Sequence, residues 1–254
     1  MKLYLSLIKK TFKRNHKLYT IKNEATLLYL ISLASYFVTP LFIILKIKPN
    51  TITLLNFVLA ITSLSFILQI NNEYFKIGLI LYFIFRVLDF CDGNVARQTN
   101  QTSFYGRFLD SILDIFYESF LILSIGFYCF KQFDNEEIFF LSIVSSVFAI
   151  YSTCIHDKYA SLVRWMNEEN NTKFIPYLRK KYLARLGFVL NDFNNLMIIA
   201  LLILNKNSEI FLIVATLFFM SFILTSLINL SKHFFSARTV FRFKAKDKKT
   251  YKKL

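Results

Sequence analysis

Residues 74–114 have the sequence YFKIGLILYFIFRVLDFCDGNVARQTNQTSFYGRFLDSILD. Two apolar runs in this stretch are joined by a polar connection, and acidic residues gather where each run meets that connection. Asp89 and Asp92 are spaced i, i+3, whereas Asp110 and Asp114 are spaced i, i+4. On helices, each pair therefore lies on one face, one turn apart. Because the short connection makes the two helices antiparallel neighbours, we expect the two pairs to face each other at one depth.

The composition is typical of a membrane protein. Of the 254 residues, 55% are hydrophobic, yet the formal net charge is +15. A soluble domain is rarely this apolar, so the apolar and basic residues must be segregated along the chain. The predicted fold is an all-α membrane protein with six transmembrane helices. They are expected at roughly residues 51–70, 74–96, 104–130, 138–163, 191–205 and 209–233.

An N-terminal amphipathic and interfacial helical region is expected before these six helices. Within residues 1–20, apolar residues alternate with cations, which is typical of a basic helix on an anionic bilayer. The stretch 25–47 is apolar enough for a further span, which is the alternative. However, Pro40 divides it into pieces too short to cross about 30 Å of hydrocarbon, so we predict an interfacial or partly re-entrant segment. The expected divisions are 1–48 for this region, 49–235 for the six-helix domain and 236–254 for a basic cytoplasmic tail.

The distribution of basic residues predicts the orientation. The loops at 71–76, 131–137 and 206–209 contain three of the 31 Lys and Arg but five acidic residues. By the positive-inside rule, the side that carries the other cations is cytoplasmic. We therefore expect both termini and the acidic pairs on the cytoplasmic side. The high Lys, Ile, Asn and Phe content is typical of an AT-rich bacterial genome, so the expected location is the bacterial cytoplasmic (inner) membrane.

Four carboxylates at one depth repel one another unless cations neutralise them. Oxygen ligands without His or Cys favour Mg²⁺, Mn²⁺ or Ca²⁺ over zinc, and four acidic side chains suit two ions, a recurrent device for in-line displacement at phosphorus. Gly93 and Gly106 lack side chains where a diphosphate can approach the backbone, and Arg97 can offer a bidentate fork to phosphate. Arg86, one turn before Asp89, is either a second phosphate contact or a salt-bridge partner of the carboxylates, and the second interpretation is favoured.

The acidic residues and their neighbours form one spaced motif. It is Asp89-x2-Asp92-Gly93-x2-Ala96-Arg97-x8-Gly106-x3-Asp110-x3-Asp114. This motif resembles the signature of the CDP-alcohol phosphatidyltransferase family, with every fixed position present. A weaker resemblance lies in the segment Pro49-Asn50-Thr51-Ile52-Thr53, which is similar to the start of the first span in many members.

The resemblance implies a reaction and a set of roles. The chain would transfer a phosphoalcohol group, phosphatidyl or related, from a CDP-alcohol donor to an acceptor hydroxyl and release CMP, in phospholipid or surface-glycan biosynthesis. Asp114 would be the catalytic general base. The metal ligands would be Asp89, Asp92, Asp110 and Asp114. The residues around the nucleotide and its diphosphate would be Gly93, Ala96, Arg97 and Gly106.

The implied partners follow from the same resemblance. They are two Mg²⁺ or Mn²⁺ ions, a CDP-alcohol donor such as CDP-diacylglycerol, a polar alcohol acceptor and an anionic lipid bilayer. A homodimer is compatible with the family, and no nucleic acid is expected.

The residues that bind the acceptor are predicted from weaker signals in spans four to six. The candidates are His156, Lys158, Arg164 and Arg185. Interfacial snorkelling is the alternative for Lys158, and a basic face on anionic lipid is the alternative for Arg185. Asn194 and Asn195 are polar residues within the fifth span and are further candidates for lining the pocket.

A divalent-cation transporter is the alternative function. It explains the spans and the intramembrane carboxylates. It does not explain Gly93, Arg97 and Gly106 at these spacings, nor carboxylates gathered at a cytoplasmic edge instead of at the bilayer midplane.

Overall fold

The computed structural model describes residues 2–15, 26–170, 181–204 and 209–240, and these residues form helices without any strand. In chain order the helices are α1 (Lys2–Asn15), α2 (Thr26–Ile44), α3 (Pro49–Ile67), α4 (Asn72–Thr99), α5 (Phe104–Phe133), α6 (Glu136–Asn170), α7 (Lys181–Ile203) and α8 (Glu209–Val240). The predicted all-α membrane fold is confirmed, and each predicted span corresponds to one helix from α3 to α8.

Five helices of the described ranges are long and apolar enough to cross a membrane, namely α2, α3, α5, α6 and α8. The apolar part of α7 is shorter, at Val189–Ile203. Helix α4 is interrupted by the charges of Arg86, Asp89 and Asp92, which lower its apolar character. Large apolar side chains such as Leu54 and Val58 are exposed along the outer faces, as expected where helices contact lipid.

Helix α2 corrects one prediction. We expected Pro40 to divide the stretch 25–47 into two pieces, but α2 continues through Pro40 to Ile44. Proline is tolerated in membrane helices because neighbouring helices and Ser or Thr side chains compensate for the freed backbone groups. Helix α2 packs on α4, and Ser35, Tyr36 and Thr39, which precede Pro40, are buried. Length and composition therefore make α2 a candidate span, where the sequence favoured an interfacial segment.

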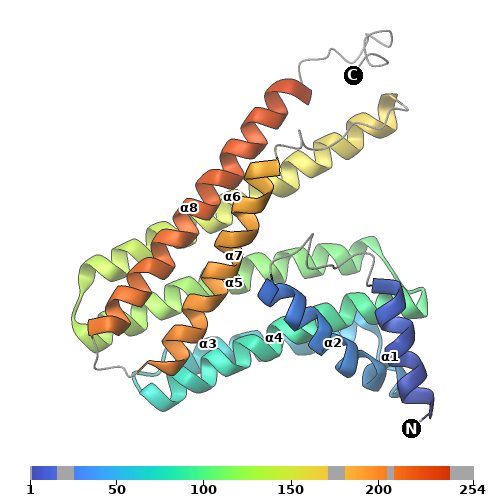
Figure 1. Cartoon of the computed structure of the whole chain (residues 1–254), viewed down its shortest axis with the longest axis horizontal. Helices are drawn as coiled ribbons and strands as arrows, with labels where there is room; N and C mark the ends of the chain where they lie inside the picture. The colour runs from blue at the N-terminus through green and yellow to red at the C-terminus, as the bar shows by residue number, and fades with distance from the viewer. Residues whose placement is uncertain (1, 16–25, 171–180, 205–208, 241–254) are drawn as a thin grey trace.

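The helices from α3 to α8 pack as a closed ring. Helix α3 packs along both α4 and α5, α5 packs on α6, α6 on α8, α8 on α7, and α7 returns to α4. Figure 1 shows α6 and α8 rising away from α3 and α4 towards the end of the bundle where α4 meets α5. Helices α1 and α2 lie outside the ring, with α2 packed on α4.

An aromatic cluster lies at the opposite end of the ring. Phe75 of α4 stacks on Tyr128 of α5 with ring centroids 4.0 Å apart, and Phe211 of α8 packs against both. All three are fully buried. This aromatic core holds the far ends of α4, α5 and α8 together, so the polar residues gather at the other end.

The connection between α4 and α5 is tight. Asn100 adopts the left-handed conformation at φ 57°, which ends α4, and Ser103 begins α5 by accepting a hydrogen bond from the Gly106 amide at 3.0 Å. This short return places the acidic ends of both helices at the same end of the bundle.

Candidate active site

Three of the four motif aspartates come together between α4 and α5. Ligand oxygens of Asp89, Asp110 and Asp114 lie within 4.8 Å of one another, and all three side chains are half-buried. We call these three residues the acidic cluster. Their i, i+4 and cross-helix arrangement matches the expectation that the two halves of the motif face each other.

Asp92 lies apart from the acidic cluster. It is 7% exposed, and its Oδ2 accepts a hydrogen bond from the Thr53 hydroxyl of α3 at 2.6 Å. Thr53 itself is buried. The sequence marked Thr53 only as the end of a weak motif, so its contact with an acidic residue 39 positions away was missed. Only the packing of α3 on α4 reveals it.

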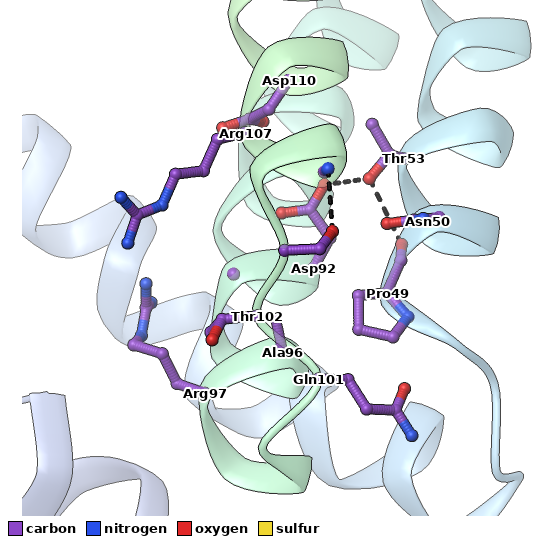
Figure 2. A pocket seen from close by; sticks show the side chains of 13 residues that line it. Pro49, Asn50, Thr53, Asp92, Ala96, Arg97, Gln101, Thr102, Arg107 and Asp110 are labelled. Carbon is purple, nitrogen blue, oxygen red and sulfur yellow. Dashed lines mark hydrogen bonds between the residues drawn. The ribbon is translucent and has the colours of Figure 1, made fainter.

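A first cavity of about 180 Å³ opens beside Asp92 and Asp110. Figure 2 shows its lining, which comes from the start of α3, the end of α4, the connection and the start of α5. All four residues predicted to surround a nucleotide line it, together with several that the sequence did not single out. The full lining is Pro49, Asn50, Thr53, Asp92, Gly93, Ala96, Arg97, Gln101, Thr102, Ser103, Gly106, Arg107 and Asp110.

Two arginines lie at one side of the first cavity. In Figure 2 the side chains of Arg97 and Arg107 extend to the same side of the pocket. Neither guanidinium has a carboxylate within 4.0 Å among the described residues. The ion pair found among those residues joins Lys76 and Glu73. Two such cations at a cavity next to carboxylates suit a ligand with phosphate groups. Arg107 was not among the predicted site residues.

Polar side chains approach both motif glycines closely. A Cβ on Gly93 would lie 3.1 Å from Nη1 of Arg97, so the absence of a side chain leaves room for the guanidinium. A Cβ on Gly106 would lie 3.1 Å from Oδ1 of Asn50 and 3.2 Å from Oγ of Ser103. Both glycines line the first cavity, and the prediction that they admit a diphosphate stays a prediction.

Helix α2 reaches the same site through hydrogen bonds. Nη2 of Arg97 donates to Oδ1 of Asn94 at 2.7 Å, and Nδ2 of Asn94 donates to Oγ of Ser35 at 3.0 Å. Asn94 and Ser35 are both buried. Ser35 of α2 thus orients Asn94, and Asn94 orients the motif arginine.

A second cavity of about 230 Å³ lies inside the helix ring and is lined by residues of α4, α5, α6, α7 and α8. Asp114 lines the second cavity, whereas Asp110, one turn away, lines the first. The lining is Tyr82, Phe85, Arg86, Asp114, Ile115, Tyr117, Glu118, Leu121, Thr153, Asn191, Asn194, Asn195, Ile198 and Phe222. Asn194 and Asn195, which we expected to line a pocket, do so.

Arg86 belongs to the second cavity. Within the described ranges no carboxylate lies within 4.0 Å of its guanidinium, so the salt bridge favoured from the sequence is absent there. Its Nε is buried and has no hydrogen-bond partner among the described residues. Arg86 is therefore available to a ligand in this cavity.

Of the predicted acceptor residues, the three whose side chains are described, His156, Lys158 and Arg164, line neither cavity. Nδ1 of His156 lies 3.0 Å from Nε2 of His233 on α8, Lys158 is exposed, and Nε of Arg164 donates to the carbonyl of Ala160 at 3.2 Å. The side chain of Arg185 lies outside the described residues. Asp157, between His156 and Lys158, stays in contact with α5, because its Oδ2 accepts a hydrogen bond from the Ser111 hydroxyl at 2.9 Å.

The donor set fits divalent metal ions. The acidic cluster offers carboxylate oxygens alone, and no Lys or Arg of the described residues lies within 4.0 Å of them. Half-buried carboxylates this close together need cations, and oxygen-only sites favour Mg²⁺ or Mn²⁺.

Comparison with known proteins gives consistent matches. The family model described as CDP-alcohol phosphatidyltransferase matches residues 46–222. A CDP-diacylglycerol–glycerol-3-phosphate 3-phosphatidyltransferase of Aquifex aeolicus is 34% identical over 93 residues, which are 37% of this chain and 50% of that protein. An archaetidylinositol phosphate synthase of Pyrococcus horikoshii is 30% identical over 110 residues, 43% of this chain and 55% of that protein. A bifunctional IPC transferase and DIPP synthase of Archaeoglobus fulgidus is 38% identical over 86 residues, 33% of this chain and 16% of that protein. The chain thus spans about half the length of the first two relatives.

Proposed function

The chain belongs to the CDP-alcohol phosphatidyltransferase family, and on this premise we propose that it transfers a phosphoalcohol group from a CDP-alcohol to an acceptor hydroxyl and releases CMP. The observation that carries the proposal is that the acidic cluster contributes a lining residue to each of two cavities, Asp110 to the first and Asp114 to the second. In-line displacement at phosphorus requires the leaving group and the nucleophile on opposite sides of the reacting atom. We propose that the donor and the acceptor approach one phosphorus atom beside the cluster from these two cavities.

The first cavity would hold the CMP part of the donor. Arg97 and Arg107 would bind oxygens of the diphosphate, and Gly93, Ala96 and Gly106 leave the space beside them. The hydrogen bond from Arg97 to Asn94 fixes the guanidinium before the donor arrives, which lowers the entropy lost on binding.

The metal site would be formed by Asp89, Asp92, Asp110 and Asp114. Two Mg²⁺ or Mn²⁺ ions bound there would neutralise the diphosphate and stabilise the leaving CMP. Because Asp92 is hydrogen-bonded to Thr53 and lies apart from the other three, it would serve the ion nearer the first cavity.

Asp114 would act as the general base. The acceptor hydroxyl in the second cavity would give its proton to a carboxylate oxygen of Asp114 while its oxygen bonds to the β-phosphorus. The bond from the β-phosphorus to the oxygen bridging to the α-phosphate breaks, and CMP departs with that oxygen. The product is the acceptor joined to the donor's alcohol through one phosphate.

The membrane setting is part of the proposal. We propose that the active site and both termini face the cytoplasm of a bacterium, that the donor is CDP-diacylglycerol or a related CDP-alcohol, and that the lysines of α1 contact anionic lipid. Lys9, Lys10 and Lys13 of α1 are exposed, as such a contact needs. The acceptor would be a polar alcohol, and assembly into a homodimer is compatible with the family.

The test is CMP release by purified protein in detergent with Mg²⁺ or Mn²⁺, a panel of CDP-alcohols and a panel of acceptors. We expect acceptor-dependent CMP formation that Asp114→Asn abolishes. Asp134→Asn is the matched control, because Asp134 is exposed at the far end of the same helix, where Asn also adopts the left-handed conformation. A folded Asp114→Asn protein that keeps wild-type turnover would refute the assignment of the base.

A further inference from the structure

A carboxylate in the interior of α7 is bonded to the start of α2. Oδ1 of Asp192 accepts a hydrogen bond from the backbone amide of Leu27 at 2.9 Å, across 165 positions of the chain. Asp192 lies well inside α7, so it does not cap its own helix. It is half-buried in the apolar part of α7, where an acidic residue is expensive and marks a functional position by default.

This bond supplies what the start of α2 lacks. The first amides of a helix have no carbonyl partner within that helix, and a negative charge near them is favourable. Helix α2 has no acidic residue in its own first turn. Asp192 therefore fastens the N-terminal end of α2 to α7.

The middle of α2 carries the contacts that orient Arg97. Nδ2 of Asn94 donates to Oγ of Ser35 at 3.0 Å and to the Thr39 hydroxyl at 3.4 Å, and Sγ of Cys91 donates to the carbonyl of Ser35 at 3.6 Å. Nη2 of Arg97 in turn donates to Oδ1 of Asn94 at 2.7 Å. Ser35 is thus the point where α2 meets the residues of α4 beside the first cavity.

The other end of α2 is fixed by the connection to α3. Backbone hydrogen bonds close residues 45–48, and α3 begins at Pro49. Release of its start would let α2 pivot about this connection. Ser35 lies about halfway between Leu27 and the connection, so a shift of about 2 Å at Leu27 moves Ser35 by about 1 Å. A movement of that size breaks a 3.0 Å hydrogen bond.

We propose that Asp192 is a positioning residue for the donor. By capping α2 it holds Ser35 against Asn94, and Asn94 holds the guanidinium of Arg97. This inference rests on the proposed transferase function. Asp192 lines neither cavity, so it acts on the donor through other residues. Helix α2, which the family match does not include, becomes the link between α7 and the first cavity.

The experiment measures the dissociation constant of CDP-diacylglycerol with Mg²⁺ on purified protein in detergent, and the Tm of each variant reports on folding. Asp192→Ala removes the cap, whereas Asp192→Asn keeps an oxygen that accepts from the Leu27 amide and serves as the rescue. Leu27→Pro removes the same bond from the α2 side, because proline lacks the amide hydrogen and is tolerated in the first turn of a helix. Glu136→Ala is the matched control, since Glu136 is an exposed acidic residue in the first turn of α6.

The two variants that remove the bond should weaken donor binding alike. Asp192→Ala and Leu27→Pro should each raise the dissociation constant about fivefold, the loss expected when the neutral bond from Asn94 to Ser35 is broken. Asp192→Asn and Glu136→Ala should stay within about twofold of the wild type. In the CMP-release assay the KM of the donor should rise by the same factor, with kcat changed less than about twofold.

A double-variant cycle tests the route. If Asp192 acts through Ser35, the combination of Asp192→Ala with Ser35→Ala should bind the donor about fivefold more weakly than the wild type, as Ser35→Ala does alone. Independent effects would multiply to about 25-fold, which would overturn the inference. A lower Tm with unchanged donor affinity in Asp192→Ala would show a purely structural role. Where Asp192→Ala does not fold, unchanged donor affinity in Leu27→Pro overturns the inference instead.

The wild-type protein separates this inference from the proposed function. Donor binding by the wild type, together with variants that do not differ from it, contradicts the role of Asp192 and leaves the proposed function intact. Absence of metal-dependent donor binding by folded wild-type protein would contradict the proposed function, and the inference would fall with it.

Discussion

The orientation of the Arg97 guanidinium should depend on Asn94 and, through Asn94, on Ser35 of α2. Replacing Asn94 by Ala removes the 2.7 Å hydrogen bond that Nη2 of Arg97 makes. Hydrogen bonds to charged groups contribute about 1.5–3 kcal/mol, which corresponds to a roughly 10- to 150-fold loss in kcat/KM for the donor. The loss should lie mainly in the KM of the donor, because Arg97 would bind the diphosphate before and during the reaction alike.

Ser35→Ala tests the second step of the same network. The bond from Asn94 to Ser35 is neutral and 3.0 Å long, so its loss is worth about 1 kcal/mol, or roughly a fivefold loss in kcat/KM for the donor. Ser32→Ala is the matched control, since Ser32 is equally buried on α2 but donates to the carbonyl of Tyr29 in its own helix. The control should change the KM of the donor less than twofold.

The assay is CMP release with the donor varied at saturating acceptor, together with metal-dependent donor binding. Equal kinetics for Ser35→Ala and Ser32→Ala, with Asn94→Ala unchanged from wild type, would show that α2 does not act on the donor site. A rise in acceptor KM without a rise in donor KM would show that the network acts elsewhere. The segment before residue 46, which the family match does not include, would then have a purely structural role.

Three further predictions concern the metal site, the first cavity and the core. EDTA should abolish CMP release and Mg²⁺ or Mn²⁺ should restore it, as followed by metal titration of chelated protein, because the acidic cluster has no cation of its own within 4.0 Å in the described ranges. Thr53→Val should raise the metal concentration for half-maximal activity by about tenfold, because it removes the 2.6 Å hydrogen bond that holds Asp92, and Thr62→Val is its control on the outer face of α3. Phe75→Ala should destabilise the protein by about 3–5 kcal/mol and lower its Tm in detergent, because it removes the ring that stacks on Tyr128. Metal-dependent donor binding should be unchanged at low temperature. An unchanged Tm would contradict the described core.

The sequence predicted much of the fold for a simple physical reason. Apolar length is a strong signal in a membrane, so six helices were expected where α3 to α8 lie. Periodicity likewise predicted that Asp89, Asp110 and Asp114 approach one another, since each lies on the face of a helix that a short connection turns towards the other. The error at Pro40 arose because the rule that proline breaks a helix is weaker in membrane bundles, where neighbouring helices pack against the helix that contains it.

The tertiary contacts of the site could not be predicted from the sequence. Nothing local shows that Thr53 binds Asp92 or that Arg86 lacks a carboxylate partner, because both depend on how α3, α4 and α7 are placed around the cavities. The candidate acceptor residues were chosen for their charge near the ends of spans. The lining of the second cavity includes asparagine and tyrosine side chains, for which polarity within an apolar helix was the only available signal.

The central claim is that one phosphorus atom at the acidic cluster is exchanged between ligands in the two cavities. The most direct test incubates purified protein with a CDP-alcohol, Mg²⁺ and a polar alcohol acceptor, and quantifies CMP and the phosphodiester product by mass spectrometry. Our account predicts equal amounts of CMP and phosphodiester, both lost in Asp114→Asn and both retained in Asp134→Asn. CMP without any phosphodiester, or metal flux across reconstituted vesicles without nucleotide turnover, would contradict it.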